Sequence, residues 1–373
     1  MKQIRSISIK NFRGLDRFKI SRLGRVNLLV GKNNTGKTTV LEALRLASSP
    51  DPRVRIYDLL TSRHEYDFAI RRDEIGWKRR DKVGYPESPS LAFESLFYGR
   101  PPFRNGESFE IDTKGEDQHL SVEFLWLKQE RTSDDAGIRY IPADFDFDPE
   151  ALPGFAIHQD DNRILFPFDR FSRVMMRRRL ATDIDSNVAY LSSAGLQPEE
   201  IGRIWDGIAL TDDEDDVIDA LRVISPNIEK LVMVQSPEAR GERMLMAKLN
   251  QFRSPMPFKS LGEGVTHLLD IVLSMIKAKN GLVLIDEIEN GIHYSVQKDL
   301  WDLVFKLSKK MDSQIFCTTH SWDCIEGFAK AGLAAPKSTG KVFRLENNDG
   351  RIETVNFSFD EIEIAASSSI ELR

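Results

Sequence analysis

The spacing of apolar and polar residues changes along the chain, and each spacing predicts a different element. In residues 2–30 the two kinds alternate in places, as at 7–9, which favours strands of an antiparallel sheet. Residues 26–30 form a short, mostly apolar run that is typical of a buried strand. Residues 39–46 follow with the pattern of a helix. The first part of the chain is therefore expected to contain antiparallel strands, then a strand, a loop and a helix.

The middle of the chain has weaker patterns. Residues 58–125 mix basic pairs and prolines with a strand-like tract at 120–125, and we expect them to complete a β-rich lobe. Residues 130–168 are rich in Asp, Pro and Phe and are expected to form loops. Short helices are predicted over 171–224, without the sustained heptads of a coiled coil, and strands that return to the main domain over 228–250.

Helices and strands alternate in the last third, which is typical of an α/β fold. After residue 260 apolar residues recur at helical spacing and predict one buried helix face. These residues are Val265, Leu268, Leu269, Val272 and Ile276. Apolar runs at 282–285 and 314–317 predict buried core strands. A hairpin is predicted over 342–355, because its Asp-Gly turn supplies the positive φ that a tight turn needs.

Length and composition narrow the class of protein. The 373 residues suit one large α/β domain with an insertion, or two domains. A net charge of −6 does not suggest a nucleic-acid binder, so any DNA contact would be local. Cys317 and Cys324 are too few for a disulfide framework, and Cys317 is expected to be an inert core thiol. Without a membrane-length apolar stretch or a visible signal peptide, we expect a cytoplasmic protein with no membrane contact.

The most informative motif is the loop after residues 26–30. Its sequence, Gly31-Lys32-Asn33-Asn34-Thr35-Gly36-Lys37-Thr38, fits the phosphate-binding pattern G-x-x-x-x-G-K-[ST]. The glycines let the backbone approach phosphate oxygens, and the N-terminus of the next helix attracts anions. Lys37 is expected to reach the β- and γ-phosphates, and the Thr38 hydroxyl to hold Mg²⁺. The alternative is a glycine-rich turn that matches the pattern by chance.

An acidic motif follows the predicted strand at 282–285. Asp286 and Glu287 lie at the carboxyl end of a parallel strand, which is where α/β folds place their ligands. Asp286 would lie near Mg²⁺, opposite Thr38, and Glu287 would orient or deprotonate an attacking water. Glu289 is a further acid. The alternative, a solvated acidic strand end, is less favoured in a chain that also has a phosphate-binding loop.

Two more turns carry groups that could contact an anion. Ser260-Leu261-Gly262-Glu263-Gly264 precedes the amphipathic helix, and its small residues would leave the helix amides open. A plain glycine turn is the alternative. The strand at 314–317 ends in Thr318-Thr319-His320-Ser321, where His320 could hydrogen-bond the γ-phosphate or the attacking water. A structural histidine is the alternative.

The order of these motifs resembles the ABC-type ATPase superfamily, and within it the branch of RecF, SMC and OLD proteins. The opening Ile9-Lys10-Asn11-Phe12-Arg13-Gly14-Leu15 looks like the N-terminal signature of that branch. The phosphate-binding loop is similar to its form, and residues 285–293 look like the OLD-type acidic motif and the D-loop after it. Specific resemblance covers about residues 1–50 and 255–345.

The resemblance implies an α/β P-loop NTPase fold, with an antiparallel β lobe and a mostly parallel β core flanked by helices. It implies three regions along the chain. Residues 1–168 would form the N-terminal lobe with the phosphate-binding loop, and 169–226 a short helical insertion. Residues 227–373 would form the C-terminal lobe with the signature turn, the acidic motif and the switch histidine.

The resemblance also implies a site that two subunits share. ATP would bind the loop of one subunit, the signature helix of another would cap the γ-phosphate, and a head-to-head homodimer or higher homo-oligomer would close. Asp286 and Thr38 would hold Mg²⁺. Glu287 would be the catalytic carboxylate and His320 the switch histidine. Arg13 is either a phosphate contact or a surface arginine. The other implied nucleotide-binding residues are Gly31, Asn33, Asn34, Thr35, Gly36, Lys37, Thr38, Thr39 and, in trans, Gly262, Glu263 and Gly264.

The chain departs from this family pattern in several ways. Gly262 stands where the signature usually has a serine, and Ser260 lies two residues earlier. Gln159 is a candidate for the Q-loop glutamine only because it precedes the helical segment. Neither an SMC-like coiled-coil tether nor the Toprim nuclease domain of OLD nucleases is expected in this chain.

Three functions remain open from the sequence. The first is an ATPase that gates a separately encoded effector, a nuclease, in anti-phage defence, because the OLD-like ATPase has no nuclease domain of its own. The second is a RecF-like repair ATPase that binds DNA in its closed dimer through basic runs at 71–72, 78–80 and 177–179. The third is a nucleotide-sensing scaffold that does not hydrolyse ATP.

Overall fold

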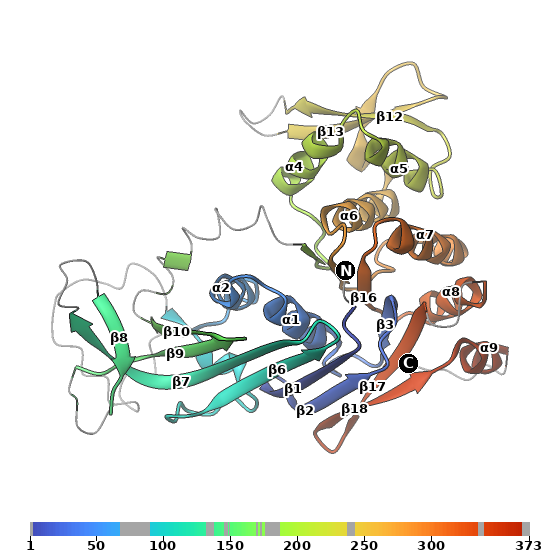
Figure 1. The fold of residues 1–373 in the computed structure, drawn as a ribbon. Helices are drawn as coiled ribbons and strands as arrows, with labels where there is room; N and C mark the ends of the chain where they lie inside the picture. Colours follow the sequence, from blue (N-terminus) through green and yellow to red (C-terminus); the bar gives the residue numbers. More distant parts are fainter. Residues whose placement is uncertain are drawn as a thin grey trace.

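The computed structural model describes residues 3–67, 90–131, 138–144, 148, 150–168, 171, 174–175, 187–236, 243–334 and 339–367 (Figure 1). Two large sheets lie side by side, where β2 (Leu15–Ser21) contacts β18 (Arg351–Phe357). A smaller unit of helices and strands lies above them in the view of Figure 1. The arrangement brings the N-terminal and C-terminal thirds of the chain into one body.

The first sheet is antiparallel, with strand order β10-β9-β7-β6-β1-β2 and β8 paired to β7. It confirms the antiparallel strands predicted near the N-terminus. Helices α1 (Lys37–Ala47) and α2 (Pro52–Ser62) share a core with its buried face. The remaining strands are β1 Ser6–Phe12, β6 Ser108–Lys114, β7 Gln118–Arg131, β8 Ile138–Pro142, β9 Leu152–Gln159 and β10 Asn162–Pro167.

The prediction of loops over 130–168 is wrong, because three strands lie there. β9 pairs with β7 from Leu152 to Gln159, and its Phe155 and Ile157 are buried in the core of the sheet. The prolines and aspartates that favoured loops lie mainly between the strands or at their ends. Pairing with the long strand β7 supplies the hydrogen bonds that local composition does not predict.

The second sheet has the order β11-β15-β16-β3-β17-β18 and is parallel from β11 to β17. Successive residues of β3 face opposite sides: Leu28 packs in the core with α6 to α8, and Leu29 in the core with α1. Burial on both faces explains the apolar runs in the sequence. The bounds are β3 Val26–Val30, β11 Val188–Leu191, β15 Leu282–Ile285, β16 Gln314–Thr318, β17 Gly340–Asn348, α6 Glu263–Lys277, α7 Gln297–Lys310, α8 Trp322–Leu333 and α9 Phe359–Ser367.

The segment predicted to be helical over 171–224 also contains a strand of the core sheet. β11 pairs in parallel with β15 from Val188 to Leu191, so the helical prediction is wrong there. Only α4 (Pro198–Ile208) and α5 (Asp212–Leu221) follow it as helices. A four-residue strand is too short to show a sequence pattern, and its place is decided by the neighbour that it pairs with.

The strands predicted to return to the main domain do not join either large sheet. β12 (Ile228–Gln235), β13 (Arg243–Leu249) and β14 (Met256–Pro257) form a separate antiparallel sheet. α5 contacts β12 and α4 contacts β13, across the expected boundary at residues 226 and 227. We call α4, α5 and β12 to β14 the small subdomain; it lies on α6 (Figure 1).

The remaining described elements are short. They are β4 Tyr66–Asp67, β5 Ser90–Leu91 and the 3-10 turns Phe93–Leu96, Phe258–Leu261 and Tyr294–Val296. The predicted hairpin is confirmed as β17 and β18, with positive φ at Asp349 and Gly350. All three basic runs considered for DNA binding lie outside the described residues. Among the helices in the described part of the chain, none is long and apolar enough to cross a membrane.

Candidate functional site: a phosphate loop beside an acidic strand end

The predicted strand, glycine loop and helix are confirmed as β3, residues 31–36 and α1. Gly31 has φ 142°, and a Cβ added to it would lie 2.5 Å from the Leu345 carbonyl oxygen of β17. Gly36 caps α1 at φ 85° without a side-chain cap, so the first amides of the helix have no such acceptor there. Asn34 also has positive φ, at 64°. These dihedrals curl the loop around the N-terminus of α1, which suits an anion.

The side chains of the loop stabilise this curl from inside. Lys37 Nζ donates to the carbonyl oxygens of Gly31, at 2.8 Å, and Lys32, at 2.9 Å. Thr35 Oγ1 donates to the same Lys32 oxygen at 2.9 Å. Burial lowers the pKa of Lys37, while the nearby carboxylates, with Asp286 the strongest, act to raise it. The loop thus presents a half-buried ammonium group, while the side chains of Asn33 and Asn34 are exposed.

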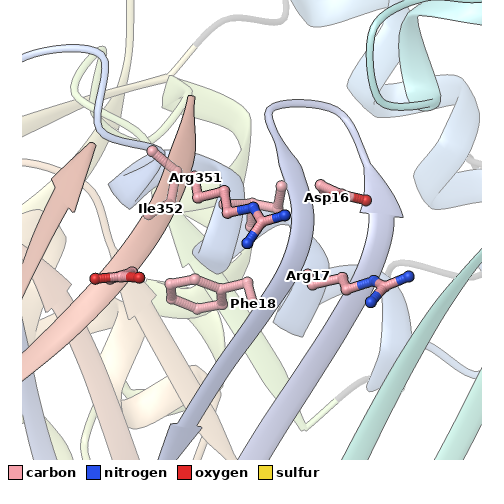
Figure 2. A pocket seen from close by; sticks show the side chains of 7 residues that line it. Asp16, Arg17, Phe18, Arg351 and Ile352 are labelled. Atoms are coloured by element: carbon pink, nitrogen blue, oxygen red, sulfur yellow. The ribbon is translucent and has the colours of Figure 1, made fainter. Parts of the chain in front are cut away.

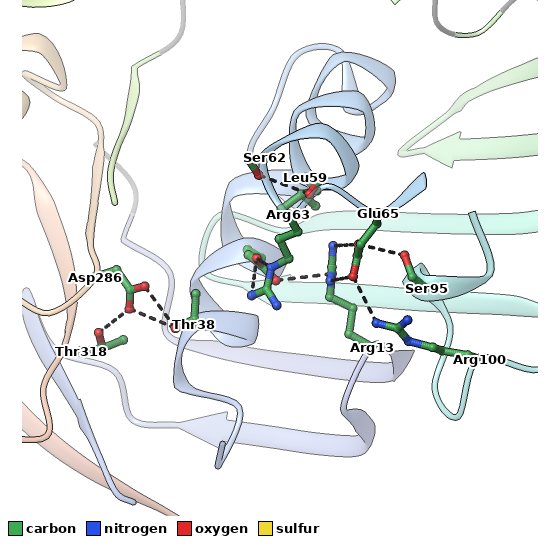
Figure 3. A network of polar contacts seen from close by, with 11 residues as sticks. Arg13, Thr38, Leu59, Ser62, Arg63, Glu65, Ser95, Arg100, Asp286 and Thr318 are labelled. Atoms are coloured by element: carbon green, nitrogen blue, oxygen red, sulfur yellow. Dashed lines mark hydrogen bonds and ion pairs between the residues drawn. The ribbon is translucent and has the colours of Figure 1, made fainter. Parts of the chain in front are cut away.

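Asp286 lies directly opposite the start of α1, as the spacing predicted. Thr38 Oγ1 is a hydrogen-bond donor 3.1 Å from both carboxylate oxygens of Asp286 (Figure 3). Thr318, at the end of β16, donates to Asp286 Oδ1 at 2.6 Å and accepts from the Glu287 backbone N–H at 2.8 Å. Three elements therefore fix one carboxylate, from the ends of β15 and β16 and the start of α1.

This corner has the chemistry that Mg²⁺ requires. A hydroxyl and a carboxylate supply hard oxygen ligands, and Mg²⁺ in nucleotide sites commonly uses one or two protein oxygens plus phosphates and waters. Among the described residues there is no group of three or more His, Cys, Asp or Glu that could hold a metal ion. Thr38 and Asp286 supply two oxygens of the kind that Mg²⁺ binds.

Glu287, Glu289 and His320 lie together next to this corner. His320 Nδ1 is 3.6 Å from Glu287 Oε1 and 3.5 Å from Glu289 Oε1. The Glu287 side chain is 43% exposed, whereas that of Glu289 is 10% exposed. Glu289 Oε1 also accepts the His320 backbone N–H at 3.1 Å. Glu287 is thus accessible to water. Glu289 connects the acidic loop, residues 286–289 after β15, to the turn that carries His320.

The signature turn, residues 260–264, leads into α6, as predicted. Gly262 has φ 105°, and a Cβ added to it would meet nothing within 4 Å. Gly264 is close to the D-loop, since a Cβ there would lie 2.5 Å from the Gly291 carbonyl oxygen. Ser260, Gly262 and Glu263 are exposed. The inner side of the turn is therefore packed, and its outer side faces solvent.

Arg13 is not a surface residue, so that alternative is wrong. It is 8% exposed, with φ 51° after β1. Its guanidinium pairs with Glu65, at 3.2 and 3.0 Å (Figure 3). It also approaches Glu42 at 3.4 Å. Glu42 lies one turn of α1 after Thr38 and is also bound by Arg63. These contacts link the N-terminal turn to α1, and the phosphate contact of Arg13 stays a prediction.

Gln159 does not lie at the phosphate-binding end of α1. It ends β9 and donates to the Ser49 carbonyl oxygen at 2.7 Å. Ser49 follows the C-terminus of α1, about 16 Å from the N-terminus for a helix of 11 residues. The Q-loop interpretation of Gln159 is therefore wrong, because β9 enters the lobe at the opposite end of the helix.

Two residues near the site were not singled out from the sequence. Thr318 was part of a motif read for its histidine, yet its hydroxyl contacts both Asp286 and Glu287. The ring of Tyr190, on β11, lies 4.8 Å from the Arg45 guanidinium. Burial raises the pKa of the Tyr190 phenol, and the Asp286 charge adds to this. A hydroxyl at the end of a core strand was an available signal for Thr318, whereas the short strand β11 offered none.

A family model matches residues 26–323, which is well over half of the chain. Its description is "AAA domain, putative AbiEii toxin, Type IV TA system". The chain belongs to this family. Two curated proteins are similar to this chain at low sequence identity. An ATP/GTP phosphatase of Helicobacter pylori is 24% identical over 354 residues, covering 87% of this chain and 86% of the relative. An uncharacterized protein of Methanocaldococcus jannaschii is 25% identical over 233 residues, covering 62% and 91%.

Solved structures that are similar in fold to this chain include SMC head domains. An SMC head bound to the C-winged helix domain of ScpA has a TM-score of 0.52 and 14% identity, covering 97% of this chain and 99% of that one. A head with an extended coiled coil, bound to the C-terminal domain of ScpA from Pyrococcus furiosus, has a TM-score of 0.50 and 12% identity, with full coverage of both chains. This AAA-domain family member is therefore a P-loop ATPase with the predicted α/β fold, and that fold is similar to the fold of SMC heads; its likeness to OLD proteins stays a prediction.

Proposed function

We propose that this chain is an ATP-hydrolysing head that closes a head-to-head dimer when ATP binds. The contact of Thr38 with Asp286, beside the exposed carboxylate of Glu287, carries the proposal. Together with the loop, these residues would supply a phosphate cradle, two Mg²⁺ ligands and a candidate base at one edge of the core sheet. That set of groups is what phosphoryl transfer to water needs. The relative named an ATP/GTP phosphatase supports the same reaction.

Each residue would do a separate part of the reaction. Lys37 and the loop amides hold the phosphates and balance their charge. Thr38 and Asp286 hold Mg²⁺, which supplies positive charge next to the phosphates. Glu287 orients the attacking water and takes its proton. His320, 3.6 Å from Glu287, donates to the γ-phosphate or to that water and so aligns the two.

The second half of the site would come from another copy of the chain. The outer side of the signature turn is exposed, and the space around Gly262 is open. A helix N-terminus in this condition can approach a phosphate that is bound to another subunit. In the proposal, closure of the dimer joins the turn of one subunit to the phosphate loop of its partner.

We propose that closure of the dimer regulates a separately encoded effector, a nuclease, in anti-phage defence. The family description names a putative toxin of a toxin–antitoxin system, which supports a second, separately encoded component but does not identify it. The site is joined to the small subdomain through residues 193–196: Asn290 donates to the Ser193 carbonyl oxygen at 3.1 Å, and Asp270 of α6 accepts from the Leu196 N–H at 3.2 Å. Movement of α6 or the D-loop would therefore reach this subdomain.

The Glu287→Gln variant tests the core of the proposal. It should bind ATP normally, accumulate as an ATP-dependent dimer and lose turnover by roughly 10²- to 10⁴-fold, the range that a general base contributes. Phosphate release and light scattering with ATP·Mg²⁺ measure the two effects. Glu326→Gln is the matched control, because Glu326 is paired with Lys330 on the exposed side of α8. Wild-type turnover in Glu287→Gln would refute the assignment.

The effector is tested separately. The chain would be purified together with the product of the neighbouring gene and assayed for nuclease activity with and without ATP. Activity that appears only in the complex supports the proposed role. If the neighbouring product neither binds the chain nor changes its turnover, this part of the proposal fails while the ATPase assignment stands.

A further inference from the structure

A pocket lies between the two large sheets, where β2 faces β18 (Figure 2). Residues 15–18 and residues 351–353 line it, and it has a volume of about 210 Å³. Pockets for drug-sized ligands measure roughly 300–1,000 Å³, so this one suits a single planar ring system. The two strands that form it come from opposite ends of the chain.

The pocket adjoins the phosphate-binding loop at Leu15, and strand β17, which pairs with β18, contacts the same loop. The Leu15 side chain, at its wall, lies 3.1 Å from the position of a Cβ on Gly36. On the other side, the Leu345 carbonyl oxygen of β17 is 2.5 Å from a Cβ on Gly31. Leu345 pairs with Thr354, which directly follows the pocket residue Glu353. A group joined to the phosphates through a sugar is thus within reach of the pocket.

The lining of the pocket suits an aromatic ring with polar edges. Arg351 reaches from β18 into the space between the strands, and the ring of Phe18 lies in the same space (Figure 2). Phe18 is 3% exposed, so its ring is almost fully covered and adds an apolar part to the lining. A guanidinium plane stacks well on aromatic faces. Asp16 stands at the turn end of β2 as an acceptor, and Asn348 fixes Glu353 through a 2.9 Å hydrogen bond to Oε2.

We propose that this pocket binds the purine base of the nucleotide and that Arg351 is its main recognition residue. The base stacks on the Arg351 guanidinium, with carboxylates at its edges to accept from exocyclic amino or ring N–H groups. Purines offer a larger face for this stacking than pyrimidines do. The inference rests on the proposed function, because it needs a triphosphate bound at Lys37. It gives the C-terminal hairpin the role of choosing the base.

Competition binding tests the proposal on the full-length chain. ATP, GTP, CTP, UTP and inorganic tripolyphosphate would each displace a fluorescent ATP analogue in the presence of Mg²⁺. Wild type should bind at least one purine nucleotide about tenfold more tightly than either pyrimidine nucleotide. Arg351→Ala should weaken that purine nucleotide about five- to thirtyfold and leave tripolyphosphate unchanged. Lys19→Ala is the control, since it removes an exposed positive charge from β2 beside the pocket.

The outcomes separate the two proposals. If tripolyphosphate and all four nucleotides fail to displace the analogue, the phosphate site itself is refuted, and the base pocket with it. If the nucleotides bind with equal affinity, or if Arg351→Ala keeps the full purine preference, the base pocket is refuted while the ATPase assignment stands. The ATP-to-GTP ratio identifies the purine. Arg351→Lys separates stacking from charge, because a loss as large as that of the alanine variant supports stacking, and full rescue refutes it.

Discussion

The phosphate-binding loop and the signature turn are both glycine-rich turns before a helix, yet their surroundings differ. Around the loop, a Cβ on Gly31 would collide with β17, and Lys37 is bound to two carbonyl oxygens of the loop itself. Around the signature turn, Gly262 has open space and both Ser260 and Glu263 are exposed. The first turn is completed by its own chain, and the second presents its outer side to solvent.

This difference suggests that the two turns have different roles in nucleotide binding and in dimer closure. A loop that is held in shape by its own chain can bind phosphates without large rearrangement, which limits the ordering cost of binding. A turn that is packed only on its inner side, through Gly264 and Gly291, can accept a ligand carried by another molecule. Substitutions in the two turns should therefore have separable effects on nucleotide binding and on dimer closure.

The largest expected effect is that of Lys37→Ala on the phosphate-binding loop. The variant should lose ATP affinity by about thirtyfold or more, because bound phosphates would bury this charge pair and truncating one partner of a buried charge pair costs roughly 2–5 kcal/mol. Isothermal titration with ATP·Mg²⁺ measures the loss. Lys330→Ala is the control, because it removes an exposed lysine that pairs with Glu326 on the surface of α8. Near-normal affinity in Lys37→Ala would remove the loop from the binding site.

Ser260→Arg, in the signature turn, should impair ATP-driven dimer formation. A bulky cation at this exposed position would obstruct a partner subunit, so ATP-driven dimer formation and turnover should fall on the order of tenfold. ATP affinity of the monomer should remain within about threefold of wild type. Analytical ultracentrifugation with and without ATP measures the dimer. Asn250→Arg, at an exposed position of the small subdomain, is the control; an equal effect there would contradict the trans role of the turn.

Glu289→Ala should uncouple the acidic loop from His320. Because Glu289 Oε1 accepts the His320 N–H at 3.1 Å, its loss should lower turnover about tenfold, close to the value of one hydrogen bond to a charged group, and leave ATP affinity unchanged. Glu289→Gln keeps an oxygen acceptor and should restore most of the activity. Steady-state kinetics measure both variants. Full activity of Glu289→Ala would contradict a positioning role.

The smallest expected effect concerns Asp270, on the helix that follows the signature turn. Burial raises the pKa of Asp270 to about 6; Glu200 adds to this, while the Leu196 N–H and Lys259 oppose it. An acid with a raised pKa holds its proton more tightly in the folded chain, so the free energy of unfolding decreases as pH rises from about 4 to about 6. Asp270→Asn should remove this decrease.

The expected gain of Asp270→Asn above pH 6 is about 1 kcal/mol, since the Leu196 hydrogen bond favours the ionised form and limits the penalty. Urea unfolding at pH 4.5 and pH 7.5 measures it. The two proteins should be similar at the lower pH and differ at the higher one. A gain that is equal at both values would contradict the assignment to Asp270, and unchanged nucleotide affinity would separate this residue from the two turns.

Much of the site could be predicted because its motifs lie at the ends of strands that are buried on both faces. Such strands have apolar runs that stand out in the sequence, as at 26–30 and 282–285, and the residue after each run lies at the edge of the sheet where α/β folds place their ligands. The opposition of Thr38 and Asp286 follows from this rule alone. The position of Gln159 could not be predicted from this rule. Its strand, β9, belongs to the antiparallel lobe, where the end of a strand does not identify a ligand-binding edge.

The sequence by itself determined the phosphate-binding loop, the acidic motif, the helix after the signature turn and the α/β class, because each depends on local periodicity or on residues adjacent in the chain. Tertiary structure alone decided that β11 joins the core sheet, that β12 to β14 form their own sheet, and that Arg13 binds Glu42 and Glu65. It also brought β18 against β2 beside the loop. These features depend on which distant segments pair, and the free energy of such pairing comes from burial and hydrogen bonds that no local pattern encodes.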